Sequence, residues 1–252
     1  MGGYDFLGKA VLVTGAAAGL GKATALAFAD AGASLCLVDL NEAGLAETAS
    51  EVERRGGRSV FLVATDISLP ENCARAVEEA VKAYGRLDAL CNVAGIVEFS
   101  HLKDITPDRW NRMMAVNLTG PLFLCQAAMP HLLKTHGAIV NVASAAAVRG
   151  QPYMTAYSAS KAALVSVTKT LATEFAKQPV RINAIAPGSM VTGMANTYVP
   201  PDVDRDLMMR IAQFRPHAQP EELAETILFL ASERASAVHG AIFNVDCGMT
   251  TI

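Results

Sequence analysis

Short runs of apolar, often β-branched residues alternate with longer amphipathic stretches along the chain. The apolar runs predict strands at Ala10–Thr14, Ser34–Asp39, Ser59–Ala64, Asp88–Asn92, Ala138–Val142, Val180–Ala186 and Ala241–Val245. The amphipathic stretches predict helices from a glycine-rich turn through about Ala31, over about Glu42–Arg55 and Glu71–Tyr84, after Pro107, and between the fifth and sixth strands. Strands that are apolar on both faces and alternate with helices indicate a parallel sheet covered on both sides. We therefore expect one α/β domain over residues 1–252, a doubly wound Rossmann sheet of about seven strands.

The least regular part of the chain is about Ser189–Pro220, which contains four prolines. Long irregular segments in compact domains are often functional loops. This segment is a candidate lid over a substrate, and the alternative is a variable surface excursion.

Charge and cysteine content exclude several classes of protein. The formal net charge is -3, which provides no basic surface for nucleic acid or an anionic membrane. The five cysteines are scattered without a CxxC pair, and the five histidines lack metal-ligand spacing. An acidic residue precedes any apolar run at the start, and no apolar stretch reaches the ~18 residues of a membrane span. We expect a soluble, cytoplasmic protein with reduced thiols and without a metal site.

A glycine-rich turn follows the first strand, with the sequence TGAAAGLG over Thr14–Gly21. Glycines permit a tight turn, let the backbone approach a pyrophosphate, and allow the helix to pack closely on the strand. The start of that helix offers free N–H groups to phosphates. The order strand, turn, helix therefore predicts a dinucleotide site.

An acidic residue, Asp39, ends the second strand, and Leu40 follows it. A carboxylate here can accept both hydroxyls of an adenosine ribose and would repel a 2′-phosphate. The turn contains no Arg or Lys that could neutralise such a phosphate. We expect NAD rather than NADP, although Asp39 could instead cap the next helix.

The chain resembles the short-chain dehydrogenase/reductase family over nearly its whole length. Thr14–Gly21 matches its TGxxxGxG motif, Asn92–Gly95 its NNAG motif, Tyr157–Lys161 its YxxxK motif and Pro187–Thr192 its PGxxxT segment, while Asn117 and Ser144 match the active-site asparagine and serine. Val93 departs from NNAG, Ala143 stands where many relatives have a serine, and Cys247 interrupts the usual Asp-Gly-Gly. None of these departures removes a catalytic group.

Tyr157 and Lys161 are four residues apart on a predicted helix, so their side chains project from one face. Free tyrosine ionises near pH ~10, which is too high for a base at neutrality. An ammonium about 4 Å away contributes about 4 kcal/mol at an effective dielectric near 20, equivalent to about three pKa units. We therefore expect Lys161 to lower the pKa of Tyr157 and make it a general acid/base.

The resemblance implies roles for further residues. Ser144 would hydrogen-bond the substrate oxygen, and Asn117 would hold a water that links Lys161 to solvent. Cofactor contacts are implied for Gly15, Ala18, Gly19, Leu20, Gly21, Asp39, Leu40, Asp66, Ile67, Asn92, Ala94, Gly95, Tyr157, Lys161, Pro187, Gly188, Met190 and Thr192. Asn117 could instead be an ordinary helix-interior residue bonded to the backbone, and Asp66 could cap the helix after Pro70.

Substrate contacts are less defined by the sequence. Arg149 and Gln151 lie between Ser144 and Tyr157, where relatives place substrate-facing residues. Arg149 could meet an anionic substrate or be an exposed loop residue. The same ambiguity holds for Glu98 and Phe99, and for Met190 and Met194 near the expected nicotinamide end.

These observations predict an NAD-dependent oxidoreductase that interconverts a secondary alcohol and a ketone. A 3-oxoacyl reductase normally uses NADPH and would fit Asp39 poorly. A catalytically silent NAD-binding regulator would be expected to have lost Ser144, Tyr157 or Lys161, and a sugar-nucleotide epimerase usually needs a larger C-terminal domain. Relatives commonly form homotetramers or homodimers, pairing the helices around Trp110–Leu133 and Ala156–Ala176 in one interface.

Overall fold

A seven-stranded parallel sheet forms the centre of the computed structural model, which describes residues 3–191, 197–209 and 214–251. Its strands are β1 (Ala10–Thr14), β2 (Ser34–Asp39), β3 (Ser59–Ala64), β4 (Ala89–Asn92), β5 (Ala138–Val142), β6 (Arg181–Pro187) and β7 (Ile242–Val245). They are arranged in the order β3-β2-β1-β4-β5-β6-β7. This order confirms the predicted doubly wound sheet, with strand ends that differ from prediction by at most one residue.

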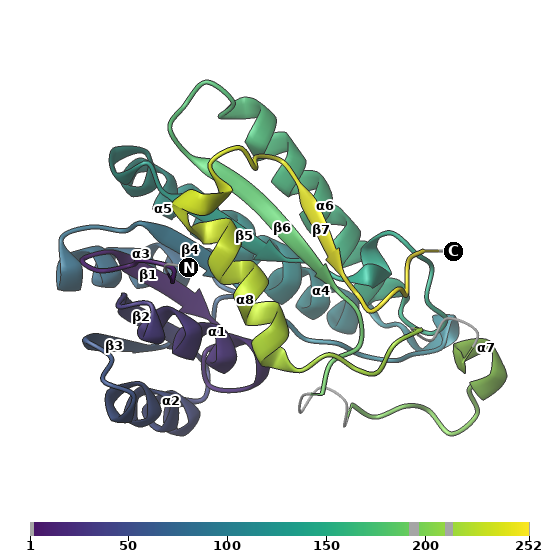
Figure 1. The fold of residues 1–252 in the computed structure, drawn as a ribbon. Helices are drawn as coiled ribbons and strands as arrows, with labels where there is room; N and C mark the ends of the chain where they lie inside the picture. The colour runs from purple at the N-terminus through teal and green to yellow at the C-terminus, as the bar shows by residue number, and fades with distance from the viewer. Residues whose placement is uncertain (1–2, 192–196, 210–213, 252) are drawn as a thin grey trace.

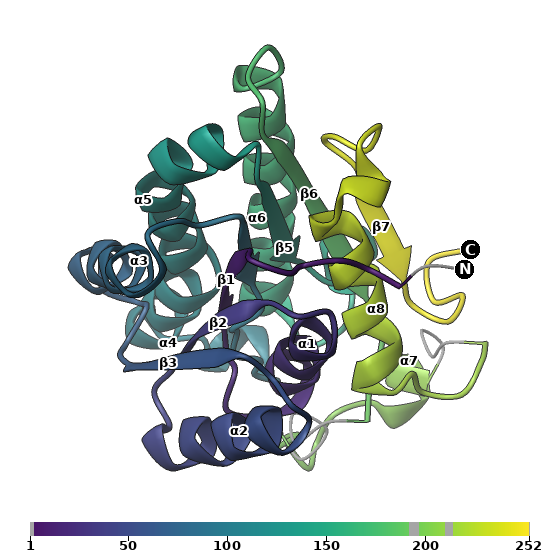
Figure 2. The ribbon, with the colours of Figure 1, turned by 60° about the vertical axis from the view of Figure 1, so that its left-hand side comes forward.

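Helices cover both faces of the sheet (Figures 1 and 2). They are α1 (Gly19–Asp30), α2 (Glu42–Arg54), α3 (Pro70–Tyr84), α4 (Pro107–Met114), α5 (Gly120–Thr135), α6 (Thr155–Glu174), α7 (Arg205–Met209) and α8 (Pro220–Ala231). Val11 and Val13 of β1 pack with residues of α1 and α8 in one core cluster, whereas Leu12 between them packs with residues of α3 and α5 in a second. The alternation along β1 explains why the strand is apolar on both faces.

The strand order reverses direction between β1 and β4, and this is where a doubly wound sheet opens a crevice for ligands. One side chain joins the two strands at that point. Thr14 Oγ1 accepts hydrogen bonds from the backbone N–H groups of Val93 and Ala94 at 3.0 and 3.1 Å. The first residue of the glycine motif therefore fixes the β4 loop beside the turn.

The long helix predicted after Pro107 is divided into three parts. Thr106 caps α4 by accepting from Arg109 N, but residues Ala115–Thr119 form a π-helical segment before α5 begins. Pro121 has no N–H to donate to the Asn117 carbonyl four residues earlier, so an α-helical ladder is interrupted at this point. The interrupted segment contains Asn117, a predicted active-site residue.

Membrane insertion finds no support in the described part of the chain, because no helix there is both long and apolar enough to cross a bilayer.

Candidate active site

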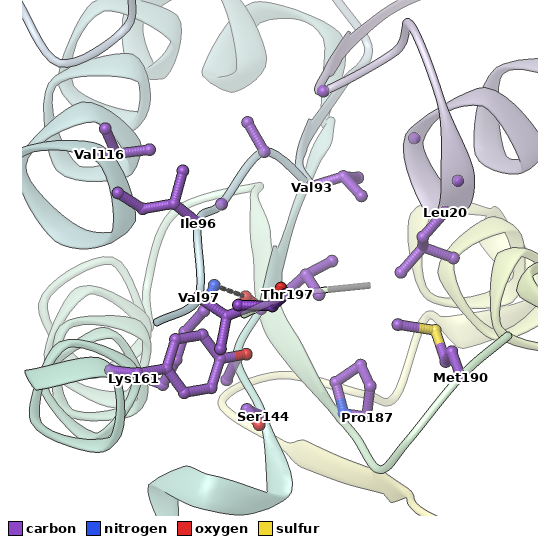
Figure 3. A pocket seen from close by; sticks show the side chains of 18 of the residues that line it. Leu20, Val93, Ile96, Val97, Val116, Ser144, Lys161, Pro187, Met190 and Thr197 are labelled. Atoms are coloured by element: carbon purple, nitrogen blue, oxygen red, sulfur yellow. Dashed lines mark hydrogen bonds between the residues drawn. The ribbon is translucent and has the colours of Figure 1, made fainter. Parts of the chain in front are cut away.

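A cavity of about 1210 Å³ opens at the carboxyl ends of the strands, and most of the predicted site residues line it (Figure 3). Those that do are Gly15, Ala18, Gly19, Leu20, Gly21, Asp39, Leu40, Asp66, Ile67, Ala94, Gly95, Ser144, Tyr157, Lys161, Pro187, Gly188 and Met190. Figure 3 shows Lys161 and Ser144 on one side of the cavity, with Leu20 and Met190 on the other. The fold thus brings the glycine motif and the YxxxK motif to one space.

Two glycines make the turn after β1 possible. Gly15 has φ 70°, and a Cβ there would lie 2.9 Å from the Cα of Ala94. A Cβ on Gly21 would lie 1.9 Å from the carbonyl oxygen of Gly15. Glycine is therefore required both by the backbone conformation at Gly15 and by the close approach of α1 to the turn.

The first turn of α1 faces the cavity with its own N–H groups. Its N-cap, Ala18, supplies no side-chain hydrogen bond, and the first turn contains no acidic residue. Ala18, Gly19 and Leu20 all line the cavity. An uncapped, positively polarised helix end beside glycines fits the pyrophosphate of a dinucleotide.

The Asp39 carboxylate lies at the cavity wall in a fixed orientation. Oδ2 accepts from Ala17 N at 3.1 Å and Oδ1 accepts from Asn41 N at 2.9 Å. Helix α2 is capped by the Asn41 side chain, which accepts from Gly44 N. Because Asn41 performs the capping, the alternative that Asp39 caps this helix is wrong.

Asp66 and Ile67 follow β3 and line the same end of the cavity. Asp66 Oδ1 accepts from Ser68 N at 2.8 Å, which closes a local turn. The N-cap of α3 is Leu69, without a side-chain cap bond. Asp66 therefore does not cap α3, although its adenine contact stays a prediction.

The Asn92 side chain does not line the cavity. It is buried, and its Nδ2 donates to Asn141 Oδ1 at 2.9 Å, with Asn141 in turn donating to Thr168 Oγ1. Strands β4 and β5 are adjacent here, and the Asn92 Oδ1 atom is buried without a hydrogen-bond partner. The Asn92 side chain joins the two strands and, through Asn141, α6, while its contact with the adenosine side of the cofactor stays a prediction.

Helix α6 presents Tyr157 and Lys161 to the cavity, as the i, i+4 spacing predicts. The Lys161 ammonium lies 5.9 Å from the centre of the Tyr157 ring and donates to the carbonyl of Val142 at 2.8 Å. Ser144 follows β5, and its Oγ accepts from Ala146 N at 3.1 Å. The three side chains are thus brought together from β5 and α6.

The pKa values of this cluster are governed by burial. Burial raises the pKa of Tyr157 above its ordinary value, and a hydrogen bond with Ser144 opposes the rise. Burial lowers the pKa of Lys161 from 10.5 to about 8. The expectation that Lys161 lowers the pKa of Tyr157 is not met in the cofactor-free protein, since removal of both groups from water disfavours their charged forms.

Asn117 lies in the π-helical segment and is fully buried, outside the cavity wall. Its Oδ1 accepts from Ile96 N and its Nδ2 donates to Ile96 O, both at 2.9 Å. A Cβ on Gly95 would lie 3.2 Å from both Asn117 Oδ1 and Lys161 Nζ. Asn117 therefore orients the loop after β4 close to Lys161, while its water-relay role stays a prediction.

The predicted substrate-facing residues divide into two groups. Phe99, Gln151 and Met190 line the cavity. Arg149 donates to the carbonyl of Met249, and Glu98 pairs with Arg109. Thr192 and Met194 lie outside the described residues.

The sequence interpretation missed Met249, which lines the cavity from the turn after β7. Its position was a usable signal, because all parallel strands deliver their following residues to the same edge. Within the described residues no group of His, Cys, Asp or Glu could hold a metal ion.

Comparisons with known proteins agree with this geometry. A family model described as enoyl-(acyl carrier protein) reductase matches residues 15–250. A 3-oxoacyl-(acyl-carrier-protein) reductase of Thermotoga maritima is 37% identical over 96% of this chain and 98% of its own. D-threitol dehydrogenase of Mycolicibacterium smegmatis is 35% identical over 98% and 95%.

Solved structures are similar over the whole chain. A short-chain dehydrogenase from Mycobacterium paratuberculosis bound to NAD has a TM-score of 0.91 at 29% identity, covering 98% of this chain and 100% of that one. Carveol dehydrogenase from Mycobacterium avium, in complex with NAD, has a TM-score of 0.89 at 26% identity, covering 99% and 100%. The chain therefore belongs to the short-chain dehydrogenase/reductase family, and is an oxidoreductase that acts on alcohols or ketones with a nicotinamide cofactor.

Proposed function

We propose that the protein interconverts a secondary alcohol and a ketone by hydride transfer with NAD. The observation that carries this proposal is the meeting of Tyr157, Ser144 and Lys161 at one cavity whose wall also includes Asp39 and the first turn of α1. The cofactor supplies the hydride acceptor for oxidation and the hydride donor for reduction. All other chemistry falls to side chains of this chain.

Tyr157 is the proposed general base for oxidation. Its phenolate removes the hydroxyl proton of the alcohol, the O–H electron pair forms the carbonyl bond, and hydride leaves the carbinol carbon. In reduction the phenol returns the proton to the developing alkoxide. Ser144, which already hydrogen-bonds Tyr157, donates to the same substrate oxygen and holds it beside the phenol.

Lys161 is the proposed source of positive charge for the phenolate. With a pKa of about 8 it is mostly protonated at neutral pH, and it lies 5.9 Å from the centre of the Tyr157 ring. An ammonium at this range favours the ionised phenol, against the burial that disfavours it. The basic form of Tyr157 therefore depends on Lys161 remaining charged.

Preference for NAD rests on Asp39. Its two hydrogen bonds to backbone N–H groups fix a carboxylate at the cavity wall, where it can accept from ribose hydroxyls and repels a phosphate. The neighbouring wall residues Ala18, Val38 and Leu40 carry no positive charge. NAD-bound structural relatives support the same assignment.

A 3-oxoacyl reductase using NADPH is the second candidate, because a Thermotoga maritima protein with that name is 37% identical. Asp39 argues against it. The NAD-dependent enzyme and the 3-oxoacyl reductase differ in the cofactor they prefer. They also differ in the direction of the reaction that they favour with an acyl thioester as substrate.

The deciding experiment follows the absorbance of the reduced cofactor over a panel of secondary alcohols and ketones, with NAD and NADP in parallel. We expect kcat/KM to be higher with NAD, and Asp39→Asn, which removes charge but keeps the shape, to narrow the difference by about 10-fold or more. A wild-type preference for NADP would contradict the proposal. Leu40→Asn is a matched control on the same wall and should leave the cofactor ratio within about 2-fold.

We also propose that the protein assembles as a homotetramer, as its relatives commonly do. The side chain of Trp110 is 36% exposed. This residue lies on α4, one of the helices expected to pair between subunits. Sedimentation of the purified protein tests this, and a monomer at micromolar concentration would contradict it.

A further inference from the structure

The wall of the cavity beyond Ser144 and Tyr157 is rich in methionine. Within the described residues, five methionines line the cavity: Met154, Met190, Met208, Met209 and Met249. They come from four separate segments, namely the loop before α6, the chain after β6, helix α7 and the turn after β7. Ile96, Val97 and Phe99 of the β4 loop line it as well. Thioether side chains are flexible and polarisable, so this wall can adapt to apolar groups of different shape.

Polar side chains at this end are directed to Met249. The Arg149 guanidinium donates to the Met249 carbonyl, and Gln151 Nε2 lies 3.4 Å from the Met249 sulfur. Arg149 is not part of the cavity wall, whereas Met249 is. Arg149, which could have received an anionic substrate, thus holds the apolar residue Met249 in place.

The remaining charges do not serve an anionic substrate well. Asp39 and Asp66 belong to the cofactor end, and Lys161 is committed to Tyr157. Of the wall residues that the structure describes, this leaves Arg112 on α4 and His217 before α8, and both are solvent-exposed. Arg112 and His217 are therefore the competitors that the experiment must test.

The turn that carries Met249 is anchored on several sides. The Asp246 carboxylate accepts from Gly248 N and Thr250 N at 3.0 Å each, while the Cys247 carbonyl accepts from Phe214 N and Arg215 N at 3.2 Å each. Met249 itself is only 5% exposed. The backbone of this turn is therefore fixed, and the Met249 side chain forms part of the cavity wall from there.

We infer that Met249 is a specificity-determining residue, and that the substrate is an alcohol or ketone whose reacting carbon bears an uncharged, apolar ring or chain. Arg149 is a positioning residue that acts through Met249. This inference rests on the proposed function for the reaction and adds the chemical class of the substrate. The buried thioether excludes a charged group, because such a group would lose its hydration without gaining a partner.

The first experiment uses two alcohols that share a ring and differ in one group, cis-4-methylcyclohexanol and cis-4-hydroxycyclohexanecarboxylate, with NAD. We expect the wild type to favour the methyl compound by at least about 10-fold in kcat/KM. Met249→Gln should reduce that ratio about 10-fold, mainly through KM, because the amide enters an apolar wall unpaired. Leu102→Gln is the control, since Leu102 is 78% exposed and does not line the cavity, and it should leave the ratio unchanged.

Preference for the carboxylate compound, abolished by Arg112→Leu or by His217→Leu, would overturn the inference and leave the proposed reaction intact. The opposite case, in which the inference holds and the proposed reaction fails, is tested by calorimetry. The binding of 4-methylcyclohexanone is measured in the presence of oxidised NAD, because a ketone and an oxidised cofactor cannot react with each other. Binding of the ketone that weakens in Met249→Gln, without turnover of any alcohol, would support the inference and contradict the proposed reaction.

The second experiment tests Arg149. We expect Arg149→Ala to raise KM for the methyl compound about 5-fold with kcat little changed, and Arg149→Lys to restore most of it by supplying a donor to the Met249 carbonyl. A direct anion-binding role predicts a different result, in which Arg149→Ala reduces kcat/KM for the carboxylate compound alone. That result would overturn the positioning role.

Discussion

The two ends of the cavity are built in different ways. At the proposed cofactor end, the wall is formed mainly by main chain, namely the turn after β1 and the open first turn of α1, together with one carboxylate fixed by two N–H groups. At the substrate end, side chains from four separate segments meet, and one of those segments follows the last strand. A backbone site accommodates one kind of ligand, whereas a side-chain wall can change without disturbing the fold.

The space around the glycines also differs between the two ends. A Cβ on Gly21 would lie 1.9 Å from the Gly15 carbonyl oxygen, yet a Cβ on Gly150, beside Arg149 and Gln151, would meet nothing within 4 Å. The cofactor end is close-packed at its main chain. At the substrate end, the loop that contains Gly150 leaves room around its main chain.

The largest expected effect is at Tyr157, where the two ends meet. Tyr157→Phe removes the proton-transferring hydroxyl and keeps the ring, so kcat should fall by about 10³-fold or more. Dissociation constants for NAD, measured by calorimetry, should change by less than about 2-fold. Full activity in this variant would disprove the mechanism, and lost NAD affinity would show that the two ends are not separable.

Lys161→Met should come next, with kcat reduced by about 100-fold because the phenolate loses its neighbouring positive charge. The effect should be larger in oxidation at pH 7 than at pH 10, where Tyr157 ionises more readily without help. An activity loss that does not depend on pH would point to a packing defect.

The same variant has a distinctive effect on stability. Lys161 has a folded-state pKa of about 8 against an ordinary value of 10.5, so the unfolded chain binds the proton more tightly between these values. The free energy of unfolding contributed by this group therefore rises with pH from about 8 to 10.5 and is lowest below 8. Denaturant titrations should show wild type gaining stability relative to Lys161→Met over that window. A flat difference would contradict the lowered pKa.

Gly21→Ala should destabilise the fold by about 1–3 kcal/mol, because its methyl group must displace the turn that carries Gly15. NAD affinity should fall as well. Gly150→Ala is the control at the other end and should remain within about 0.5 kcal/mol of wild type. Equal losses at both positions would break the contrast between the two ends.

The sequence predicted that the residues after β1 and β2 line one cavity, because their positions depend on local order. The glycine motif, Asp39 and the strand ends lie on β1 and β2, whose periodicity is clear, and parallel strands bring their carboxyl ends together. The motif did not reveal which face of β4 the Asn92 amide occupies. The position of Met249 after the last strand could have indicated a wall residue, but its partners, Arg149 and Gln151, lie about one hundred residues away and become neighbours only through the fold.

The π-helical segment illustrates another limit. Pro121 marked a helix that could not stay regular, but whether the chain would kink, end or widen there depends on what packs around it. A Cβ on Gly120 would lie 2.5 Å from the Ile67 carbonyl, so α5 approaches the β3 loop closely. That approach is a tertiary contact, which periodicity does not contain.

The smallest expected effect concerns the anchoring of the segment just before α7. Tyr153, with φ 63°, accepts from Asp204 N at 2.9 Å just before α7, and its ring packs on His101, which bonds Asp202 at 3.0 Å. Tyr153→Phe removes one hydrogen bond and keeps the ring packing, so KM for the alcohol should rise about 2–4-fold while NAD affinity stays constant. Steady-state kinetics at saturating NAD measure this change. If NAD affinity fell instead, Tyr153 would serve the cofactor end, and the separation between a backbone site and a side-chain wall would fail at this loop.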